Sequence, residues 1–589
     1  MDLSFSQVYV GLIVVFLVLS LYREWFNPAL TFFTAAVALL VGQIISPAEL
    51  LQGLSNQQII VIFLLVLATS GIRSVIGPEA LGRLFNPNLT PRGFLFRMMA
   101  TTSVLSSVLN NTPIVAFMIP YVKEWAEKTG QPASKYLIPL SFATILGGMI
   151  TVIGTSTNLV LNGLVQQYGL PMLEFADFFY LGILVTIVGW IYLYFVGFRL
   201  LPANANEIEA LRENLKEYII ETEILRGSPL IGKTVREAGL RNLRDVFLVE
   251  IIRDERVISP ASPEEVLREK DALFFSGNPQ AIYQLIKEDN GLSVPEDHET
   301  EANGHFNFVE AVIPAHSELV GMRIRDSDFR KRYNASIIAI HRNGKRVPGK
   351  VGEMTLAGGD FLLLLSGDGR VNGSQEKDLF YVSAPRKVKE EAPKYKRIIG
   401  VLSIVLLISG VVGIMPLFDA AIIILAAMVF FGVLSLSEIR RELDLSLLLI
   451  LVCSLAIGVA LEKSGTADVI ARTLVSSVEA WGPIWVVAAL FLATTGLTAL
   501  ITNAAAVSIM FPIAMSVAEH VGLPSTPFFM AIAFAASGDF MTPIGYQTNL
   551  MVYGPGGYTF RDFFKVGAPL TLLYATLCIT FISYFYNLV

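Results

Sequence analysis

The sequence predicts a polytopic α-helical membrane protein, arranged as an inverted repeat, that carries a soluble insert of two α+β modules. Three observations lead to this fold class. Hydrophobic residues make up 53% of the 589 residues and charged residues only 16%, which is more apolar than an ordinary soluble domain. A polar motif interrupts the apolar sequence in each of two halves. A charged stretch over 203–395 separates these halves and is too polar to lie in hydrocarbon.

Long apolar runs predict the membrane-spanning helices. A helix needs ~20 apolar residues to cross the hydrocarbon core, so the shorter runs would rely on tilt or on flanking residues. We expect the first run to remain as a span, because no basic residue precedes it as in a cleavable signal. The main runs are 8–21, 29–45, 59–72, 179–196, 398–415, 420–434, 447–461 and 570–585.

The polar motifs come in two matched pairs. Asn110-Asn111-Thr112 in the first half corresponds to Thr502-Asn503-Ala504 in the second. Farther along, Gly154-Thr155-Ser156-Thr157-Asn158 corresponds to Gly545-Tyr546-Gln547-Thr548-Asn549, and each lies at nearly the same distance from the earlier asparagine. Polar breaks at corresponding places in two apolar halves are typical of the central binding site of a secondary transporter.

The residue types in these motifs suit a cation and an anion together. Non-helical backbone survives at membrane depth only where it is buried or lines a wet cavity, so we expect the breaks to meet there. Asn, Ser and Thr oxygens with free carbonyls suit a hard monovalent cation, whereas amide and hydroxyl donors and helix N-termini suit an anion. The alternative is that these side chains only join helices to one another.

Basic residues near the spans predict the orientation of the chain. They favour the cytoplasmic side, and Arg23, Arg440, Arg199 and Lys394 all agree with an insert inside the cell. The lysines within 123–135 fit only if nearby glutamates offset them on the outer side. With a cytoplasmic insert, equivalent polar breaks must enter the membrane from opposite sides, which is an inverted repeat.

The insert is itself duplicated. One unit opens at Gly227 and closes at Gly277, and the other opens at Ser317 and closes at Gly367. Each contains alternating apolar residues that predict a hairpin, over 246–257 and over 335–347, the second with Asn343-Gly344 at its turn. We therefore divide the chain into a first membrane repeat, two modules and a second membrane repeat, over 1–202, 207–291, 304–384 and 396–589.

Composition also argues against several other classes of protein. A net charge of −6 does not provide the basic face that nucleic acids require. The two cysteines lie in apolar runs and predict neither a disulfide framework nor a metal site. The sequence contains no evident pairing of a nucleophile with a base and no dinucleotide motif in a suitable setting, so we expect no enzyme and no organic cofactor.

With these motifs, the chain resembles the divalent anion/sodium symporters, a family of sodium-coupled dicarboxylate, citrate and sulfate carriers. The inserted modules resemble the C-terminal half of potassium-conductance regulatory domains (RCK_C). The resemblance implies re-entrant hairpins, a homodimer, and elevator-like movement of the hairpins and loops against a static scaffold. It also implies two sodium sites beside one anion. The sodium ligands carried over are Ser106, Asn110, Asn111 and Gly154 in the first site, and Thr498, the carbonyl of Ile501, Asn503 and Gly545 in the second.

Departures from the family motifs bear on the substrate. The second motif ends in Ala504 and so lacks a hydroxyl, while Ser156-Thr157 and Gln547-Thr548 replace proline pairs and add donors. A compact tetrahedral oxyanion fits this better than an extended dicarboxylate, so we expect sulfate first and a di- or tricarboxylate second. The anion-binding residues carried over are Asn111, Thr112, Thr155, Ser156, Thr157, Asn158, Thr502, Asn503, Ala504, Gln547, Thr548 and Asn549.

Several alternatives stay open at this point. Asp539 lies near the second loop and either caps a half-helix or assists a cation or proton. The insert either binds a cytoplasmic ligand that regulates transport or only braces the scaffold. The protein itself is either a sodium-driven importer in the plasma membrane, the inner membrane if it is bacterial, or a transporter-like anion sensor.

Overall fold

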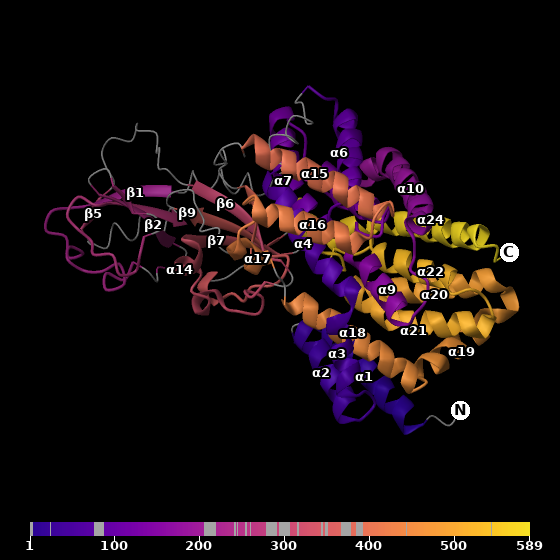
Figure 1. The fold of residues 1–589 in the computed structure, drawn as a ribbon. Coiled ribbons are helices and arrows are strands. Elements are labelled where there is room, and N and C mark those ends of the chain that lie inside the picture. The colour runs from indigo at the N-terminus through magenta and orange to yellow at the C-terminus, as the bar shows by residue number, and fades with distance from the viewer. Residues whose placement is uncertain are drawn as a thin grey trace. The chain divides into compact units, whose positions relative to one another are not determined.

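The structure is a computed structural model, and its described part forms two compact units (Figure 1). One comprises Met1–Pro202, Val388–Val552 and Thr559–Val589, and the other comprises Ala203–Lys387 and Tyr553–Tyr558. The structure describes the chain apart from residues 1–3, 24, 27, 76–87, 205–218, 241–242, 244–245, 254–255, 259–260, 278–290, 294–306, 315–316, 343–344, 348–350, 367–378, 384–392, 443–444, 544 and 589.

Among its described residues, the first unit consists of helices and the loops between them, in an N-terminal segment and a C-terminal segment that is interrupted at Tyr553–Tyr558. The N-terminal segment contains α1 (Phe5–Tyr22), α2 (Pro28–Val41), α3 (Pro47–Gln52), α4 (Gln57–Val75), α6 (Pro91–Ser106), α7 (Asn111–Thr129), α8 (Ser134–Gly148), α9 (Ser156–Gln167), α10 (Phe175–Tyr192) and α11 (Phe198–Leu200). The C-terminal segment contains α15 (Lys394–Val411), α16 (Leu417–Phe430), α17 (Leu436–Glu442), α18 (Leu445–Lys463), α19 (Thr466–Val478), α20 (Pro483–Thr498), α21 (Asn503–Val521), α22 (Thr526–Ser537), α23 (Gln547–Tyr553) and α24 (Phe560–Phe585).

Several of these helices can cross a membrane. Each predicted apolar run lies largely within one helix, as expected for segments whose backbone must satisfy its own hydrogen bonds. Within the described residues, four helical segments are long and apolar enough to span, and α18 and α19 form one further candidate with a bend of 71°. The four are Pro47–Ile72, Phe175–Leu200, Asn503–Val521 and Phe560–Phe585. The protein is therefore a multi-pass membrane protein.

Helix packing is repeated between the two segments. α6, α7 and α10 all pack on α8, and α20, α21 and α24 all pack on α22 in the same order along the chain. Figure 1 shows α20, α21 and α22 next to one another in orange and yellow. Each set has a break of four residues between its first two helices, after Ser106 and after Thr498, where the polar motifs lie. The duplicated sequence therefore folds into a duplicated arrangement of helices.

In its described residues, the second unit contains two antiparallel sheets of five strands each. The first has the order β3-β2-β4-β1-β5, and the second, taken from its opposite edge, has the matching order β8-β7-β9-β6-β10. The first sheet consists of β1 (Ile219–Ile224), β2 (Val246–Arg253), β3 (Arg256–Ile258), β4 (Ala272–Gly277) and β5 (Leu292–Ser293). The second consists of β6 (Asn307–Val312), β7 (Ala335–Arg342), β8 (Lys345–Arg346), β9 (Phe361–Ser366) and β10 (Phe380–Ser383), with α14 (Phe329–Tyr333) before β7.

Local interactions in the two sheets also match. Both predicted hairpins are present, because β2 pairs with β3 and β7 with β8, although the Asn343-Gly344 turn lies outside the described residues. Arg253 holds the buried Asp271 in a bidentate pair at 2.7 and 2.8 Å, and Arg342 holds the buried Asp360 at 2.7 Å through both nitrogens. The insert is thus two copies of one small fold.

Candidate functional site

The first polar break is organised by the Ser106 hydroxyl, at the C-terminus of α6. This hydroxyl lies within hydrogen-bond distance of two acceptors that share its single proton, the Thr144 carbonyl at 2.7 Å and Asn111 Oδ1 at the start of α7. Ser106 and Asn111 are 0% and 1% exposed. The hydroxyl therefore ties the two ends of the break to each other and to α8.

The second break has the same arrangement with threonine in place of serine. The Thr498 hydroxyl donates to Asn503 Oδ1 at 2.9 Å and to the Ala536 carbonyl on α22 at 3.0 Å. In both halves, the hydroxyl residue lies 5 residues before the asparagine and 38 residues before the residue that supplies the carbonyl. The side chain of Thr502 also caps α21 by accepting from the Ala505 amide at 3.4 Å. The correspondence seen in sequence thus extends to individual hydrogen bonds.

The Gly-x-x-Thr-Asn loops are held by two threonines that sequence reasoning missed. The Gly154 amide donates to the Thr151 hydroxyl at 3.2 Å, and Asn158 Nδ2 donates to the Thr151 carbonyl at 3.2 Å. In the second loop Gly545 and Asn549 make the same contacts with Thr542, at 3.1 Å each.

A signal for these threonines exists in the sequence. Thr151 and Thr542 each stand three residues before the loop glycine, so the repeated motif is Thr-x-x-Gly-x-x-Thr-Asn rather than its second half alone. The amides of Asn158 and Asn549 are engaged in holding these loops closed.

The two halves meet through side chains of the first break and the second loop. Asn111 Nδ2 donates to the Tyr546 hydroxyl at 2.6 Å, and Thr112 donates to Gln547 Oε1 at 3.1 Å. The Tyr546 hydroxyl also interacts with the Thr155 side chain of the first loop. Three of the four sequence motifs, the first break and both loops, are therefore linked around the buried Tyr546 and Asn111.

A second link between the halves starts at Ser141, one turn of α8 before Thr144. Ser141 donates to Thr548 Oγ1 at 2.9 Å and to Asn549 Oδ1 at 2.7 Å. All three of these side chains are fully buried. Ser141 was not among the predicted site residues, since it lies in an apolar run without any local motif.

Oxygen atoms converge on the two loop glycines. A side chain at Gly154 would collide with the carbonyls of Ser106 and Gly148, and a side chain at Gly545 would collide with the carboxylate of Asp539. Gly148 in turn lies against the Asn111 amide group. Only glycine lets the loop backbone approach these oxygens, and such a cluster is the ligand type that small hard cations prefer.

Not all predicted residues take part in these contacts. Asn110 and Ser156 line a small cavity of about 30 Å³ beside α4, which has room for about one water molecule. Thr502 is exposed, and Ala504 has only a methyl group to present. Thr157 lies 3.4 Å from the Thr155 hydroxyl within its own loop. Ile501 is buried and lies within the second break.

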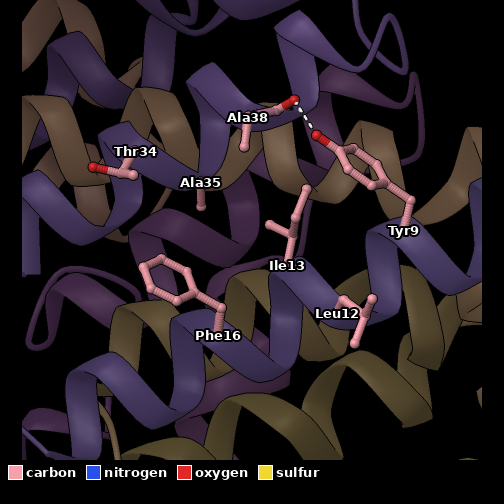
Figure 2. Close-up of a pocket in the computed structure, with 7 residues that line it drawn as sticks. All are labelled: Tyr9, Leu12, Ile13, Phe16, Thr34, Ala35 and Ala38. Carbon is pink, nitrogen blue, oxygen red and sulfur yellow. Dashed lines mark hydrogen bonds between the residues drawn. The ribbon is translucent and has the colours of Figure 1, made fainter.

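A larger pocket lies away from these motifs, between α1 and α2 (Figure 2). It has a volume of about 280 Å³, and the Tyr9 hydroxyl beside it donates to the Ala38 carbonyl at 2.9 Å. Its walls carry no charged side chain and few polar ones, so it suits an acyl chain better than a small anion. The lining residues are Tyr9, Leu12, Ile13, Phe16, Thr34, Ala35 and Ala38.

Comparison with known proteins identifies the family. A family model described as citrate transporter matches residues 14–523 and 404–588, which together cover nearly the whole chain. The chain belongs to the citrate transporter family. The predicted transporter class is therefore confirmed, and this is a family of transporters rather than of enzymes.

Proteins similar to this member of the citrate transporter family are described in several ways. A Chlamydomonas reinhardtii protein described as a candidate sulfur deprivation response regulator is 33% identical over 93% of this chain and 96% of its own. An uncharacterized Synechocystis transporter is 33% identical over 95% of this chain and 94% of its own. Sodium/sulfate cotransporter 1 of Chlamydomonas reinhardtii is 24% identical over 93% of this chain and 86% of its own.

Proposed function

We propose that this protein is a sodium-coupled importer of a divalent inorganic anion, with sulfate as the first choice. The observation that carries the proposal is the duplicated set of hydrogen bonds, in which Ser106 bonds to Asn111 and to a carbonyl of α8, and Thr498 bonds to Asn503 and to a carbonyl of α22. Relatives named as sodium/sulfate cotransporters support the choice of ions.

Each half supplies one sodium site in this proposal. The first is formed by Ser106, Asn110, Asn111 and Gly154, and the second by Thr498, Ile501, Asn503 and Gly545. The convergence of the Ser106 and Gly148 carbonyls and the Asn111 amide near Gly154 supports the first set. Uncharged oxygens of this kind replace the water shell of a monovalent cation without trapping it.

The anion lies between the two breaks and the two loops. None of the predicted anion-binding residues is basic, so the anion is held by hydroxyl, amide and backbone donors and by the adjacent sodium ions. Asn111 serves both purposes, since its oxygen faces Ser106 and its nitrogen faces Tyr546. Many short neutral donors suit a compact oxyanion better than a long dicarboxylate.

Transport follows an elevator-like path in which both hairpins and both loops move together. The hydrogen bonds from Asn111 to Tyr546 and from Thr112 to Gln547 support this, because they tie the first break to the second loop as one body. The proposal also includes an inverted repeat with re-entrant hairpins and a homodimer in the plasma membrane. Its last part is a cytoplasmic insert of RCK_C-type modules. The matching strand orders of the two sheets support a pair of like modules. In this proposal the modules bind a cytoplasmic regulator, and the alternative is that they only brace the scaffold.

Two alternatives have specific support. A di- or tricarboxylate substrate is favoured by the description of the family as citrate transporters. A sensor of external anion is favoured by the relative described as a candidate sulfur deprivation response regulator, which matches almost the entire chain. Sodium-driven accumulation separates transport from sensing, because a sensor has no need to couple two cation sites to movement of the anion.

The deciding experiment is uptake of radiolabelled sulfate into proteoliposomes with and without an inward sodium gradient, with succinate and citrate as competitors. Accumulation that needs sodium and is blocked by unlabelled sulfate alone supports the proposal. Block by a carboxylate, or uptake of labelled citrate, moves the protein to the carboxylate alternative. Specific sulfate binding without accumulation supports the sensor.

A further inference from the structure

We infer that Asp539 supplies a carboxylate ligand to the second cation site, which makes that site anionic while the first stays neutral. The inference rests on the proposed sodium coupling and adds a residue that the family motifs do not include. Asp539 follows the C-terminus of α22 and is 3% exposed. It lies six residues before Gly545, the predicted backbone ligand of the second site.

The carboxylate faces the loop glycine directly. Asp539 Oδ2 accepts a hydrogen bond from the Thr542 hydroxyl at 2.9 Å, and that hydroxyl accepts from the Gly545 amide at 3.1 Å. The space in which Gly545 would carry a side chain is filled by Asp539 Oδ2. The Asp539 carbonyl also accepts from Asn549 Nδ2 at 3.0 Å, which fixes the residue against the loop. The Asp539 carboxylate is therefore held against Gly545, where the proposed ligands of the second sodium site converge.

The first half shows what the carboxylate replaces. There the threonine hydroxyl, from Thr151, donates to the backbone carbonyl of Ser107, and the Gly148 carbonyl lies against the loop glycine. In the second half, one carboxylate oxygen of Asp539 does both: it accepts from the corresponding Thr542 hydroxyl, and it lies against the loop glycine, Gly545. Because the loop glycine and the loop asparagine bond to the corresponding threonine in both halves, the difference adds one negative charge to a loop that is otherwise held in the same way.

The surroundings leave this charge to be balanced by a cation. Among the described residues, Asp539 forms no ion pair, and the adjacent helices α9 and α20 carry no ionisable side chain. α24 presents Tyr574 and Cys578 as buried groups, while its Arg561 and Lys565 are exposed. The amides of Met541 and Thr542 donate to the carboxylate and stabilise it as dipoles, but they bring no net positive charge. A buried carboxylate without a counter-charge is costly, so a bound cation stabilises it.

The test compares Asp539→Asn with wild type in the full-length protein. Asparagine keeps the size and an acceptor oxygen but removes the charge. We expect the sodium concentration for half-maximal sulfate uptake to rise at least about tenfold, equivalent to ~1.4 kcal/mol of cation binding. The KM for sulfate at saturating sodium should change much less. The rise in melting temperature that sodium causes relative to choline, measured on detergent-solubilised protein, should shrink as well.

Two further variants define the outcome. Asp562→Asn removes a carboxylate that caps α24 and should leave the sodium response unchanged. Asp539→Ser also removes the charge, so it replaces Asp539→Asn in the same measurements if Asp539→Asn does not fold. An unchanged half-saturating sodium concentration together with an unchanged sodium-induced thermal shift would show that Asp539 only caps its loop. A wild-type protein without any sodium response overturns the proposed function, and the inference with it.

Discussion

Asn111 uses the two ends of its amide for different tasks, which sets it apart from the other asparagines of the site. Its oxygen accepts from Ser106 within the first half, and its nitrogen donates to Tyr546 in the second. Asn503 has the corresponding bond to Thr498, so both asparagines hold the break in their own half. If the proposed first sodium site exists, this side chain couples its occupancy to the position of the opposite loop.

Removing these amides should impair the cation response. We expect Asn111→Ala and Asn503→Ala each to raise the sodium concentration for half-maximal uptake by about tenfold or more, the effect of losing ~1.4 kcal/mol of binding. Both proteins should still fold, because little core volume is lost. Sodium titration of sulfate uptake tests this, with Ser107→Ala as a neighbouring control whose hydroxyl donates back to the Val104 carbonyl of α6. Normal sodium dependence in both asparagine variants would contradict the assignment.

Ala504 stands where the first half has Thr112, whose hydroxyl reaches Gln547. Ala504→Thr restores a hydroxyl to the second break and should change the preference between sulfate and carboxylates by about 1 kcal/mol, or roughly fivefold, the typical contribution of one hydrogen bond. Competition of succinate and citrate against labelled sulfate measures this preference. An unaltered competition profile would mean that residue 504 does not face the anion.

At the scale of elements, each binding loop depends on one threonine that fastens it to the break. Thr151 accepts from the Gly154 amide, donates to the Ser107 carbonyl and accepts Asn158 at its own carbonyl. The two hydrogen bonds of the Thr151 hydroxyl join the residue after α6 to the loop before α9. The position of the loop glycine, and with it the oxygen cluster, therefore depends on a side chain outside the Gly-x-x-Thr-Asn motif.

Replacing this hydroxyl should loosen the loop. Thr151→Val keeps the shape but leaves a buried amide and a buried carbonyl without their partner, which costs about 1–3 kcal/mol. We expect a lower melting temperature and weaker sodium-dependent uptake. Thr576→Val on α24 is the matched control, since its hydroxyl bonds only to Leu572 one turn earlier. Equal melting temperatures for the two variants would show that the threonine is dispensable.

At the scale of the whole molecule, the short segment Tyr553–Tyr558 packs with the insert although it belongs to the second half in sequence. Asn204 Nδ2 donates to the carbonyls of Gly556 and Gly557 at 3.2 and 2.7 Å, and Gly554 lies against the Phe361 side chain of β9. The same segment follows α23 directly, and α23 begins with the predicted anion-binding residues. The chain thus connects the insert to the second loop through a few residues.

This connection predicts an effect of Asn204 on transport rate. Asn204→Ala should change the maximal rate of uptake by up to about fivefold, the factor that corresponds to ~1 kcal/mol of lost hydrogen bonding, while the KM for sulfate stays close to wild type. Asn204→Gln keeps the donor and should restore part of the wild-type rate. Initial-rate measurements over a range of sulfate concentrations separate the two parameters. Wild-type rates in Asn204→Ala would argue that the insert does not act through this segment.

The sequence by itself determined the class of the protein and its repeats. Many long apolar runs in one chain are typical of a membrane protein, and the duplicated motifs at Asn111 and Asn503 recur at matched spacing, so both features can be found without coordinates. The hairpins over 246–257 and 335–347 were equally visible, because strand alternation is a local pattern.

Only the tertiary structure decided which of these residues meet. Asn111 meets Tyr546, and Ser141 meets Thr548, over separations of 435 and 407 residues, and no local pattern records a contact over such a distance in sequence. Asp539 was open to two interpretations because its role depends on what faces it, and the fold places its carboxylate against Gly545. Local periodicity is written in neighbouring residues, whereas a binding site is a property of packing, which only the folded chain contains.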